Sequence, residues 1–297
     1  MVEITRRRLL AIAAGPIIPF PQQTSGATPQ INPRSTWAID RPARGPLEEE
    51  EVRFLLVHHT ASGNGHSVDE VPDLLRGIYD FHTGPERVWN DIAYNFLIDA
   101  GGGIWEGRSG SLAGPVAGDA NGGNQGFSQL VCLIGDFDTA QPSPASLDSL
   151  VDLLAWLADR YQVATEPGSQ VTFSSRGSNL WASGAQVSTQ TITGHRTMSQ
   201  TSCPGSNLNS YVTGDLMANV SEARRAAVAG EAPSSTTTTT TTTTTTDEQV
   251  PPTSSTTTTT IPPTPPPTRS PLILAAAAIA ALATLLAAWR ARRMGDR

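Results

Sequence analysis

The chain has 297 residues and a formal net charge of −7 at pH 7, because 27 Asp and Glu outnumber 20 Lys and Arg. This balance, with no Lys/Arg patch between residues 33 and 228, argues against a nucleic-acid partner. Composition divides the sequence into residues 1–27, a mixed segment at 33–228, and a remainder that is Thr/Pro-rich and then apolar. The mixed segment is long enough to bury one sizeable hydrophobic core.

Residues 1–27 show the order of charged and apolar groups that an export signal has. Arginines at 6–8 precede an apolar stretch through Phe20, and small residues at 25–27 offer a cleavage site. Paired arginines followed by two leucines are typical of a twin-arginine signal. A general secretion signal with a basic start is the alternative.

The segment from 33 to 228 alternates between strand-like and helix-like patterns. Apolar and β-branched runs predict strands at residues 52–59, 93–99, 104–106, 130–135 and 191–193. Apolar residues at helical spacing predict helices at 68–81, 145–161 and 207–227, with Ser67 as the cap of the first. Glycines at 101–103 predict a turn that folds 104–106 back on the preceding strand. The pattern predicts an α/β fold, with a mixed central β-sheet packed with helices.

Histidines and a cysteine in two compact motifs predict a metal site. His58 and His59 end the first expected strand, and His195 and Cys203 lie eight positions apart in GHRTMSQTSCPG. Zinc takes nitrogen and sulfur ligands, and a catalytic zinc keeps three protein ligands and one open position. Because side chains alternate along a strand, only one of His58 and His59 can face such a site, and alternation does not say which. Packed core residues are the alternative interpretation.

Cys132 offers a second role for Cys203. Export favours a disulfide between the two cysteines. Cys132, however, lies inside the apolar run VCLIG, where a free buried thiol is common. We therefore favour a metal-binding Cys203, with the disulfide as the alternative.

Five motifs resemble a known enzyme family when they are taken in order. They are LLVHHTA at 55–61, WNDIAYNFLID at 89–99, GIWEGR at 103–108, VCLIGDF at 131–137 and GHR…TSCPG at 194–205. Together they resemble the zinc N-acetylmuramoyl-L-alanine amidases (amidase type 2) related to peptidoglycan recognition proteins and phage T7 lysozyme. The resemblance covers about residues 33–211.

The resemblance implies zinc-dependent hydrolysis of the amide between N-acetylmuramic acid and L-alanine in peptidoglycan. It assigns the zinc ligands to His58, His195 and Cys203, with His59 packed nearby. It also implies that Tyr94 is catalytic, and that Thr201 stands where phage relatives carry lysine. Both hydroxyls would assist the proton and oxyanion steps.

Two other functions stay open. The domain could bind peptidoglycan without cutting it, although non-catalytic relatives usually lack the cysteine ligand. It could also be a structural zinc domain of a surface protein, but a structural zinc site normally has a fourth protein ligand, and none is evident nearby in the sequence. The spare imidazoles, His66 and His82, lie in or beside the first expected helix, where solvated or core roles are expected.

Two stretches depart from the resemblance. Residues 113–115 read Ala-Gly-Pro where many relatives have a histidine that lines the substrate groove. Residues 171–190 look like a polar insertion, with Arg176 and Trp181 as the notable side chains. The insertion is interpreted either as a surface loop or as one wall of the groove.

The remainder of the chain predicts a membrane anchor. Residues 229–270, rich in Thr and Pro, predict a disordered stalk. Residues 271–289 carry no charge and, at about 1.5 Å per residue, are long enough to cross a bilayer core of about 30 Å. The arginines of 290–297 predict a cytoplasmic tail. We therefore expect an exported protein, anchored by a C-terminal transmembrane helix with the zinc amidase domain at 33–228 facing the cell wall.

Overall fold

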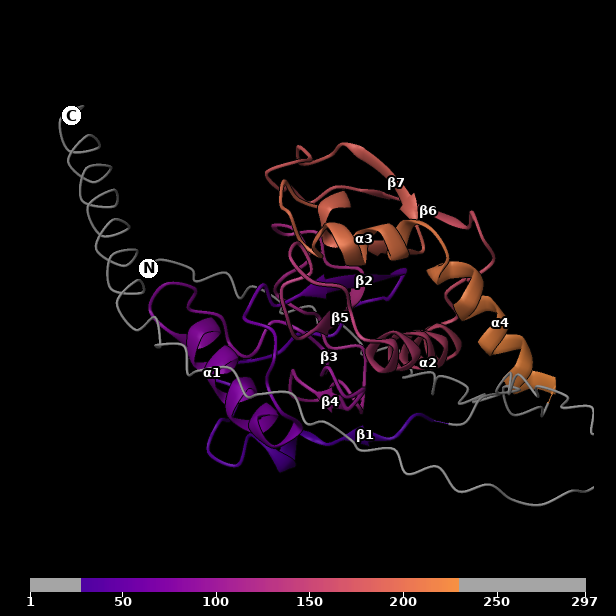
Figure 1. The fold of residues 1–297 in the computed structure, drawn as a ribbon. Coiled ribbons are helices and arrows are strands. Elements are labelled where there is room, and N and C mark those ends of the chain that lie inside the picture. The colour runs from indigo at the N-terminus through magenta and orange to yellow at the C-terminus, as the bar shows by residue number, and fades with distance from the viewer. Residues whose placement is uncertain (1–27, 230–297) are drawn as a thin grey trace, which may run out of the picture. The chain divides into compact units, whose positions relative to one another are not determined.

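The computed structural model describes residues 28–229, and Figure 1 shows their arrangement. The expected export signal at 1–27 lies outside the described residues. So do the stalk from residue 230 onward, the apolar segment at 271–289 and the basic tail at 290–297. Within residues 28–229, every helix is too short or too polar to cross a bilayer.

A six-stranded mixed sheet forms the centre of the fold. Its strands are β1 (Ile31–Asn32), β2 (Phe54–His59), β3 (Phe96–Ile98), β4 (Ile104–Glu106), β5 (Ser128–Leu133) and β8 (Ile192–Gly194). They lie in the order β1-β4-β3-β5-β2-β8. Only the pair β3 and β4 is antiparallel, joined by the expected glycine turn. The prediction of a mixed α/β sheet is confirmed, although β1 was not expected.

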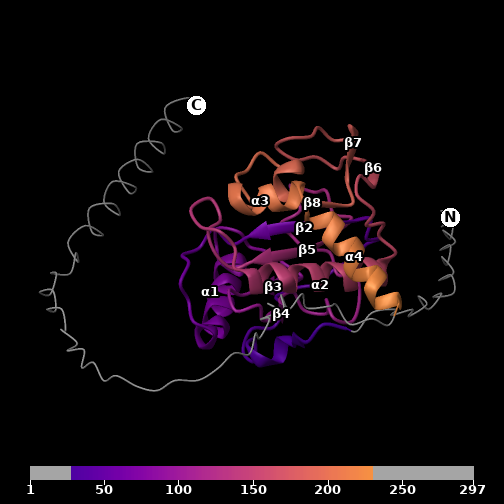
Figure 2. The ribbon, with the colours of Figure 1, turned by 45° about the vertical axis from the view of Figure 1, so that its right-hand side comes forward.

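Helices cover the sheet on both faces. They are α1 (Val71–Thr83), α2 (Pro144–Tyr161), α3 (Ser206–Thr213) and α4 (Leu216–Ala229), with short 3₁₀ turns at η1 (Arg34–Thr36), η2 (Val68–Glu70) and η3 (His195–Thr197). Figure 2 shows α2 in front of the strands, while α1 packs on the opposite face. Alternate residues of β2 therefore face different layers. Leu55 and Val57 pack with α2, α3 and α4, whereas Phe54 and Leu56 face the other way.

The strongest helix prediction agrees with the structure. The N-cap of α2 is Ser143, whose Oγ accepts the N–H of Ser146 at 3.0 Å, and Pro144 occupies the first turn. The apolar face of α2, including Leu150, Leu154 and Leu157, is fully buried against the sheet. Helix α1 also forms near its expected range, although its first turn is the separate 3₁₀ turn η2.

The prediction of one closing helix at 207–227 is wrong. Helix α3 ends at Thr213 and α4 begins at Leu216. Gly214 breaks the run, because its backbone has left the helical region (φ −97°, ψ −99°) while its N–H still bonds back to Ser210. Glycine pays the largest entropy cost in a helix, so a break there is the least costly solution.

The insertion at 171–190 forms an ordered hairpin and not an irregular loop. Strands β6 (Gln170–Ser174) and β7 (Gln186–Gln190) pair antiparallel as a separate two-stranded sheet. Val171, Phe173 and Val187 alternate with polar residues, a period of two that predicts strands. Because the outward-facing residues are polar, the segment is polar in overall composition, and these two strands were not predicted.

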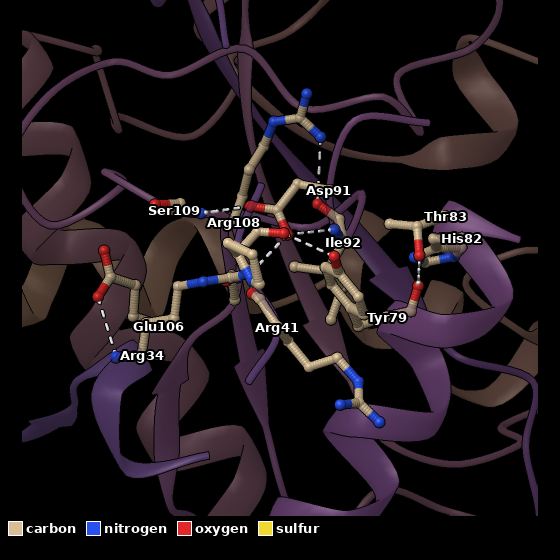
Figure 3. A network of polar contacts seen from close by, with 12 residues as sticks. Arg34, Arg41, Tyr79, His82, Thr83, Asp91, Ile92, Glu106, Arg108 and Ser109 are labelled. Atoms are coloured by element: carbon tan, nitrogen blue, oxygen red, sulfur yellow. Dashed lines mark hydrogen bonds and ion pairs between the residues drawn. The ribbon is translucent and has the colours of Figure 1, made fainter. Parts of the chain in front are cut away.

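A buried ion pair holds the segment between α1 and β3 (Figure 3). Asp91 Oδ1 accepts from Arg34 Nη2 at 2.7 Å and from the N–H of Ile92 at 2.7 Å, and Oδ2 accepts the N–H of Ser109 at 2.9 Å. The Asp91 side chain is fully buried and that of Arg34 is 11% exposed. Three bonds to one carboxylate group thus join η1, the loop before β3 and the loop after β4.

Replacing Asp91 with alanine should lower the free energy of unfolding by about 3 kcal/mol, because Arg34 would keep a buried charge without a partner. Asp80→Ala is the matched control. It removes an ion pair with Arg41 in which the aspartate is half exposed, and should cost less than about 1 kcal/mol. Urea unfolding of both variants measures the difference. Equal losses of unfolding free energy in the two variants would contradict the prediction, because the buried ion pair would then contribute no more than the exposed one.

Candidate metal centre

The register of the parallel strands brings the expected ligands together. β8 pairs with β2 so that Gly194 lies beside Val57. The next residues along these two stretches are His195 and His58. Cys203 reaches the same place from a turn farther along the chain. The ligand atoms of the two histidines and the cysteine all lie within 4.8 Å of one another.

Contacts within this group are short and buried. His58 Nδ1 lies 3.5 Å from Cys203 Sγ, and the rings of His58 and His195 have centroids 4.5 Å apart. His58 is fully buried, and its Nε2 has no hydrogen-bond partner. A buried polar atom without a partner is costly. The arrangement therefore indicates that another group binds here.

The structure places His58, and not His59, in the group. His59 points to the other side of the sheet, where its Nδ1 accepts the N–H of Phe137 at 3.3 Å. The backbone N–H of His59 still serves the site, because it donates to Cys203 Sγ at 3.5 Å. This bond orients the sulfur and favours its charged form.

Burial keeps both imidazoles of the group neutral. It lowers the pKa of His58 well below its ordinary value, with smaller effects of His195 and His59, and it lowers the pKa of His195 to about 4. Both rings thus have a free lone pair at neutral pH. Burial also raises the pKa of the Cys203 thiol to about 12, so this thiol needs a nearby cation to ionise.

The donor set fits a zinc ion. Two imidazole nitrogens and one sulfur are ligands that zinc prefers, and a bound cation would ionise the thiol and give the buried nitrogens a partner. In residues 28–229, no fourth His, Cys, Asp or Glu side chain joins the group. Three protein ligands leave one coordination position open, as in catalytic sites and unlike closed structural sites.

Tyr94 lies beside the group, just before β3. Its ring centroid is 5.2 Å from that of His58. Burial raises the pKa of its phenol well above the ordinary value, and the nearby thiols Cys132 and Cys203 add to the shift. The phenol is therefore protonated at neutral pH, so it can donate a hydrogen bond but does not act as a base.

His82, expected to be solvated or a simple core residue, supports the segment that carries Tyr94. It is buried at the end of α1, and its Nδ1 accepts the N–H of Ala93 at 3.1 Å. Its ring lies 5.5 Å from that of Tyr94 and 5.0 Å from that of Trp89. No signal in the sequence marks this role, since a histidine in a last helical turn is common.

Thr201 lies at the exposed rim of the site. Its Oγ1 accepts the N–H of Cys203 at 3.2 Å, so the hydroxyl supports the turn that carries the thiol. The hydroxyl proton stays free to donate to another group. This geometry gives Thr201 a structural contact that its sequence position did not indicate.

Residues 113–115, which the resemblance marked as a departure, bond to the segment before β2 and to α2. The carbonyl of Pro115 accepts the N–H of Glu50 at 3.0 Å, and the carbonyl of Ala113 accepts from Arg160 of α2 at 2.7 Å. The departure thus occupies the junction between α2 and the segment that leads into β2.

Cys132 and Cys203 are both free thiols in the structure. Cys132 is fully buried on β5, beside His58 in the strand register. Burial raises the pKa of its thiol well above the ordinary value. The alternative of a disulfide between the two cysteines is therefore not what the structure forms.

The chain matches the model of one protein family over residues 48–206, more than half of its length. The description of that family is N-acetylmuramoyl-L-alanine amidase. The matched range contains the three expected ligands and both hydroxyl residues: His58, Tyr94, His195, Thr201 and Cys203.

Individual proteins are similar to parts of the chain. It is 34% identical over 111 residues to peptidoglycan-recognition protein LE of Drosophila melanogaster, which covers 37% of this chain and 32% of that protein. It is 29% identical over 185 residues to N-acetylmuramoyl-L-alanine amidase of Sus scrofa, which covers 61% of this chain and 26% of that one. The solved structure of Drosophila PGRP-LB aligns with a TM-score of 0.48 at 26% identity, covering 62% of this chain and 93% of that chain. The chain thus spans a third or less of these two curated relatives.

Acid should destabilise the protein partly through His82. Burial, followed by Arg87 and Arg108, lowers its pKa to about 4, below the ordinary value of about 6.5. Between these values the unfolded chain binds a proton at this site and the folded chain does not, so stability falls as pH falls from about 6.5 to about 4.

His82→Asn removes this titration and keeps an acceptor for the N–H of Ala93. Both proteins are compared without zinc. Between pH 6 and 4.5, the free energy of unfolding should fall with pH less steeply in the variant than in the wild type, and the two slopes should differ by about 1 kcal/mol per pH unit. Urea unfolding at several pH values measures both slopes, and parallel slopes would contradict the assignment. The two proteins should have the same pH dependence above pH 7.

Proposed function

Because this chain belongs to the N-acetylmuramoyl-L-alanine amidase family, we propose that it hydrolyses the amide bond between N-acetylmuramic acid and L-alanine with a zinc ion at His58, His195 and Cys203. The chain carries a peptidoglycan amidase-type domain over residues 48–206. Peptidoglycan is accordingly the proposed substrate.

The convergence of three ligand atoms within 4.8 Å carries this proposal. The set includes a buried thiol and an imidazole nitrogen without a partner. A three-residue set with an open position supports hydrolysis more than a structural role. The neutral state of both imidazoles at neutral pH also supports metal binding, because the lone pairs need no deprotonation.

Zinc held by these groups supplies a Lewis acid that makes water nucleophilic near neutral pH and polarises a carbonyl. The chain's own residues then have distinct tasks. Tyr94, protonated and beside His58, donates a hydrogen bond to the amide oxygen as that oxygen gains negative charge. The Thr201 hydroxyl, at the rim, can orient the substrate through its free proton.

A non-catalytic role in peptidoglycan binding is the second candidate. It is favoured by similarity to a protein named for recognition, peptidoglycan-recognition protein LE. The presence of Cys203 in the ligand group argues for catalysis instead. Metal content and product analysis separate the two.

Cys203→Ser should lose most of the bound zinc, since a hydroxyl replaces the sulfur ligand. The wild type should carry about one zinc per chain. Cys132→Ala is the matched control, because it removes the other buried thiol and should keep its zinc. Elemental analysis measures the content, and circular dichroism checks that each variant is folded. Full zinc retention by Cys203→Ser would rule out the ligand assignment.

Tyr94→Phe should keep zinc but lower the hydrolysis rate by about 100-fold or more, because the carbonyl oxygen loses a hydrogen-bond donor in the transition state. Defined muropeptides, read by mass spectrometry, measure both rate and bond. The expected products are a glycan with a free lactyl carboxyl group and a peptide that begins with L-alanine. Cleavage between sugars or deeper in the peptide would contradict the proposed reaction, and binding without products would favour recognition alone.

A further inference from the structure

We propose that Asn179 and Trp181, in the loop of the β6–β7 hairpin, position the segment between the ligands His195 and Cys203. By doing so they set the affinity of the metal centre and the rate of the reaction. The inference rests on the proposed function, because it concerns the same metal centre. From the sequence, two interpretations of this hairpin stay open: a surface loop or one wall of the substrate groove.

The hairpin is fixed to the strand that carries the first ligand. Its inner residues Phe173 and Val187 pack in one buried cluster with Phe54 and Leu56 of β2. The rings of Phe54 and Phe173 are stacked, with centroids 5.5 Å apart. These β2 residues lie on the same face as His58. The hairpin therefore has a defined position relative to the metal site.

The loop of the hairpin is held at its base by a buried glutamine. Gln125 Oε1 accepts the N–H of Arg176 at 3.1 Å, and its Nε2 donates to Ser175 Oγ at 2.8 Å. The N–H of Asn124 donates to the carbonyl of Gly177 at 3.0 Å. Since Gln125 is fully buried, the loop is anchored before it reaches the ligand-bearing segment.

The tip of this loop bonds directly to the ligand-bearing segment. Asn179 Oδ1 accepts the N–H of Gln200 at 2.8 Å and the hydroxyl of Ser199 at 2.7 Å. The Trp181 indole N–H donates to the carbonyl of Thr197 at 2.8 Å. Asn179 Nδ2 also donates to the carbonyl of Gln200 at 3.4 Å, so four hydrogen bonds join the loop to residues 197–200, midway between the two ligands.

Most other hydrogen bonds of this segment are local. The N–H groups of Met198 and Ser199 bond to the carbonyl of His195, and Arg196 bonds to the carbonyl of Ser202. The start of the segment is also bonded to β8, because Thr197 Oγ1 donates to the carbonyl of Gly194 at 2.9 Å. Beyond Thr197, burial of the Met198 side chain and the contacts from Asn179 hold the turn in place. Ligand positions need to be held within a fraction of an ångström for full metal affinity and rate.

Matched variants separate positioning from general stability. Asn179→Ala removes all side-chain bonds of this residue, whereas Asn179→Asp keeps the oxygen for the two shorter bonds, from Gln200 and Ser199, and loses only the 3.4 Å bond from Nδ2. Asn179→Asp should therefore rescue the function. Trp181→Phe keeps an aromatic ring but removes the N–H donor. Gln186→Ala is the control, because this exposed residue lies on the same hairpin and, among the described residues, its side chain makes no hydrogen bond to the ligand-bearing segment.

Zinc affinity is measured on the full chain by competition with a chelator, and ligand geometry by the visible spectrum of the cobalt-substituted protein. Asn179→Ala and Trp181→Phe should bind zinc about 10-fold more weakly, the usual loss when a group that orients a ligand is removed. Their cobalt spectra should shift, and kcat should fall more than KM changes. Asn179→Asp and Gln186→Ala should stay within about 3-fold of the wild type.

Unchanged zinc affinity and cobalt spectrum in both Asn179→Ala and Trp181→Phe would overturn the inference. Equal losses in Gln186→Ala, or a lack of rescue by Asn179→Asp, would also overturn it, because the effect would then be general destabilisation. If the wild type itself binds no zinc, the proposed function fails instead. Thermal unfolding of the zinc-free proteins identifies any variant that does not fold, and the other variant then decides.

Discussion

Parallel pairing of β2 with its two neighbours determines where every part of the metal centre lies. Val57 stands beside Gly194 on one side and beside Val131 on the other. A slip of one residue in β2 would turn His58 toward the layer of α2 and bring His59 to the site, because successive side chains face opposite layers. Packing that differs between the two faces of β2 opposes that slip, because Phe54 stacks on Phe173 of the hairpin whereas Leu55 and Val57 pack in the cluster that contains α2. The hydrophobic core therefore specifies the ligand geometry.

Burial in the same core means that the polar groups of the metal centre lower the stability of the fold when no metal is bound. His58 is fully buried with one nitrogen unpartnered, and the Cys203 thiol is held far from its ionised form. Such polar groups would weaken a fold if they served packing alone. The surrounding apolar layers offset this cost. A bound cation would give each of these groups a partner, so that their contribution to the stability of the fold would become favourable.

Two separate supports hold the residues around the centre. On the side of α1, the Arg34–Asp91 ion pair and His82 fix the segment that leads to Tyr94. On the other side, the β6–β7 hairpin contacts the segment between His195 and Cys203. Both supports use hydrogen-bonded polar groups that are buried or anchored, which gives more rigidity than apolar contact alone. The site thus lies between two braced loops on a rigid sheet.

Much of this protein follows from local sequence. Apolar runs and helical spacing predicted the strands that carry His58 and precede His195, and the amphipathic helix at 145–161, because burial imposes a period on the side chains. The motifs also identified the three candidate ligands and Tyr94. Side-chain alternation alone left open which of His58 and His59 faces the site, and the resemblance assigned His58; the tertiary structure places His58 there, because strand register sets the face of each side chain. It also decided the break at Gly214 and the contacts of His82 and Asn179, because these depend on partners far along the chain that no local pattern encodes.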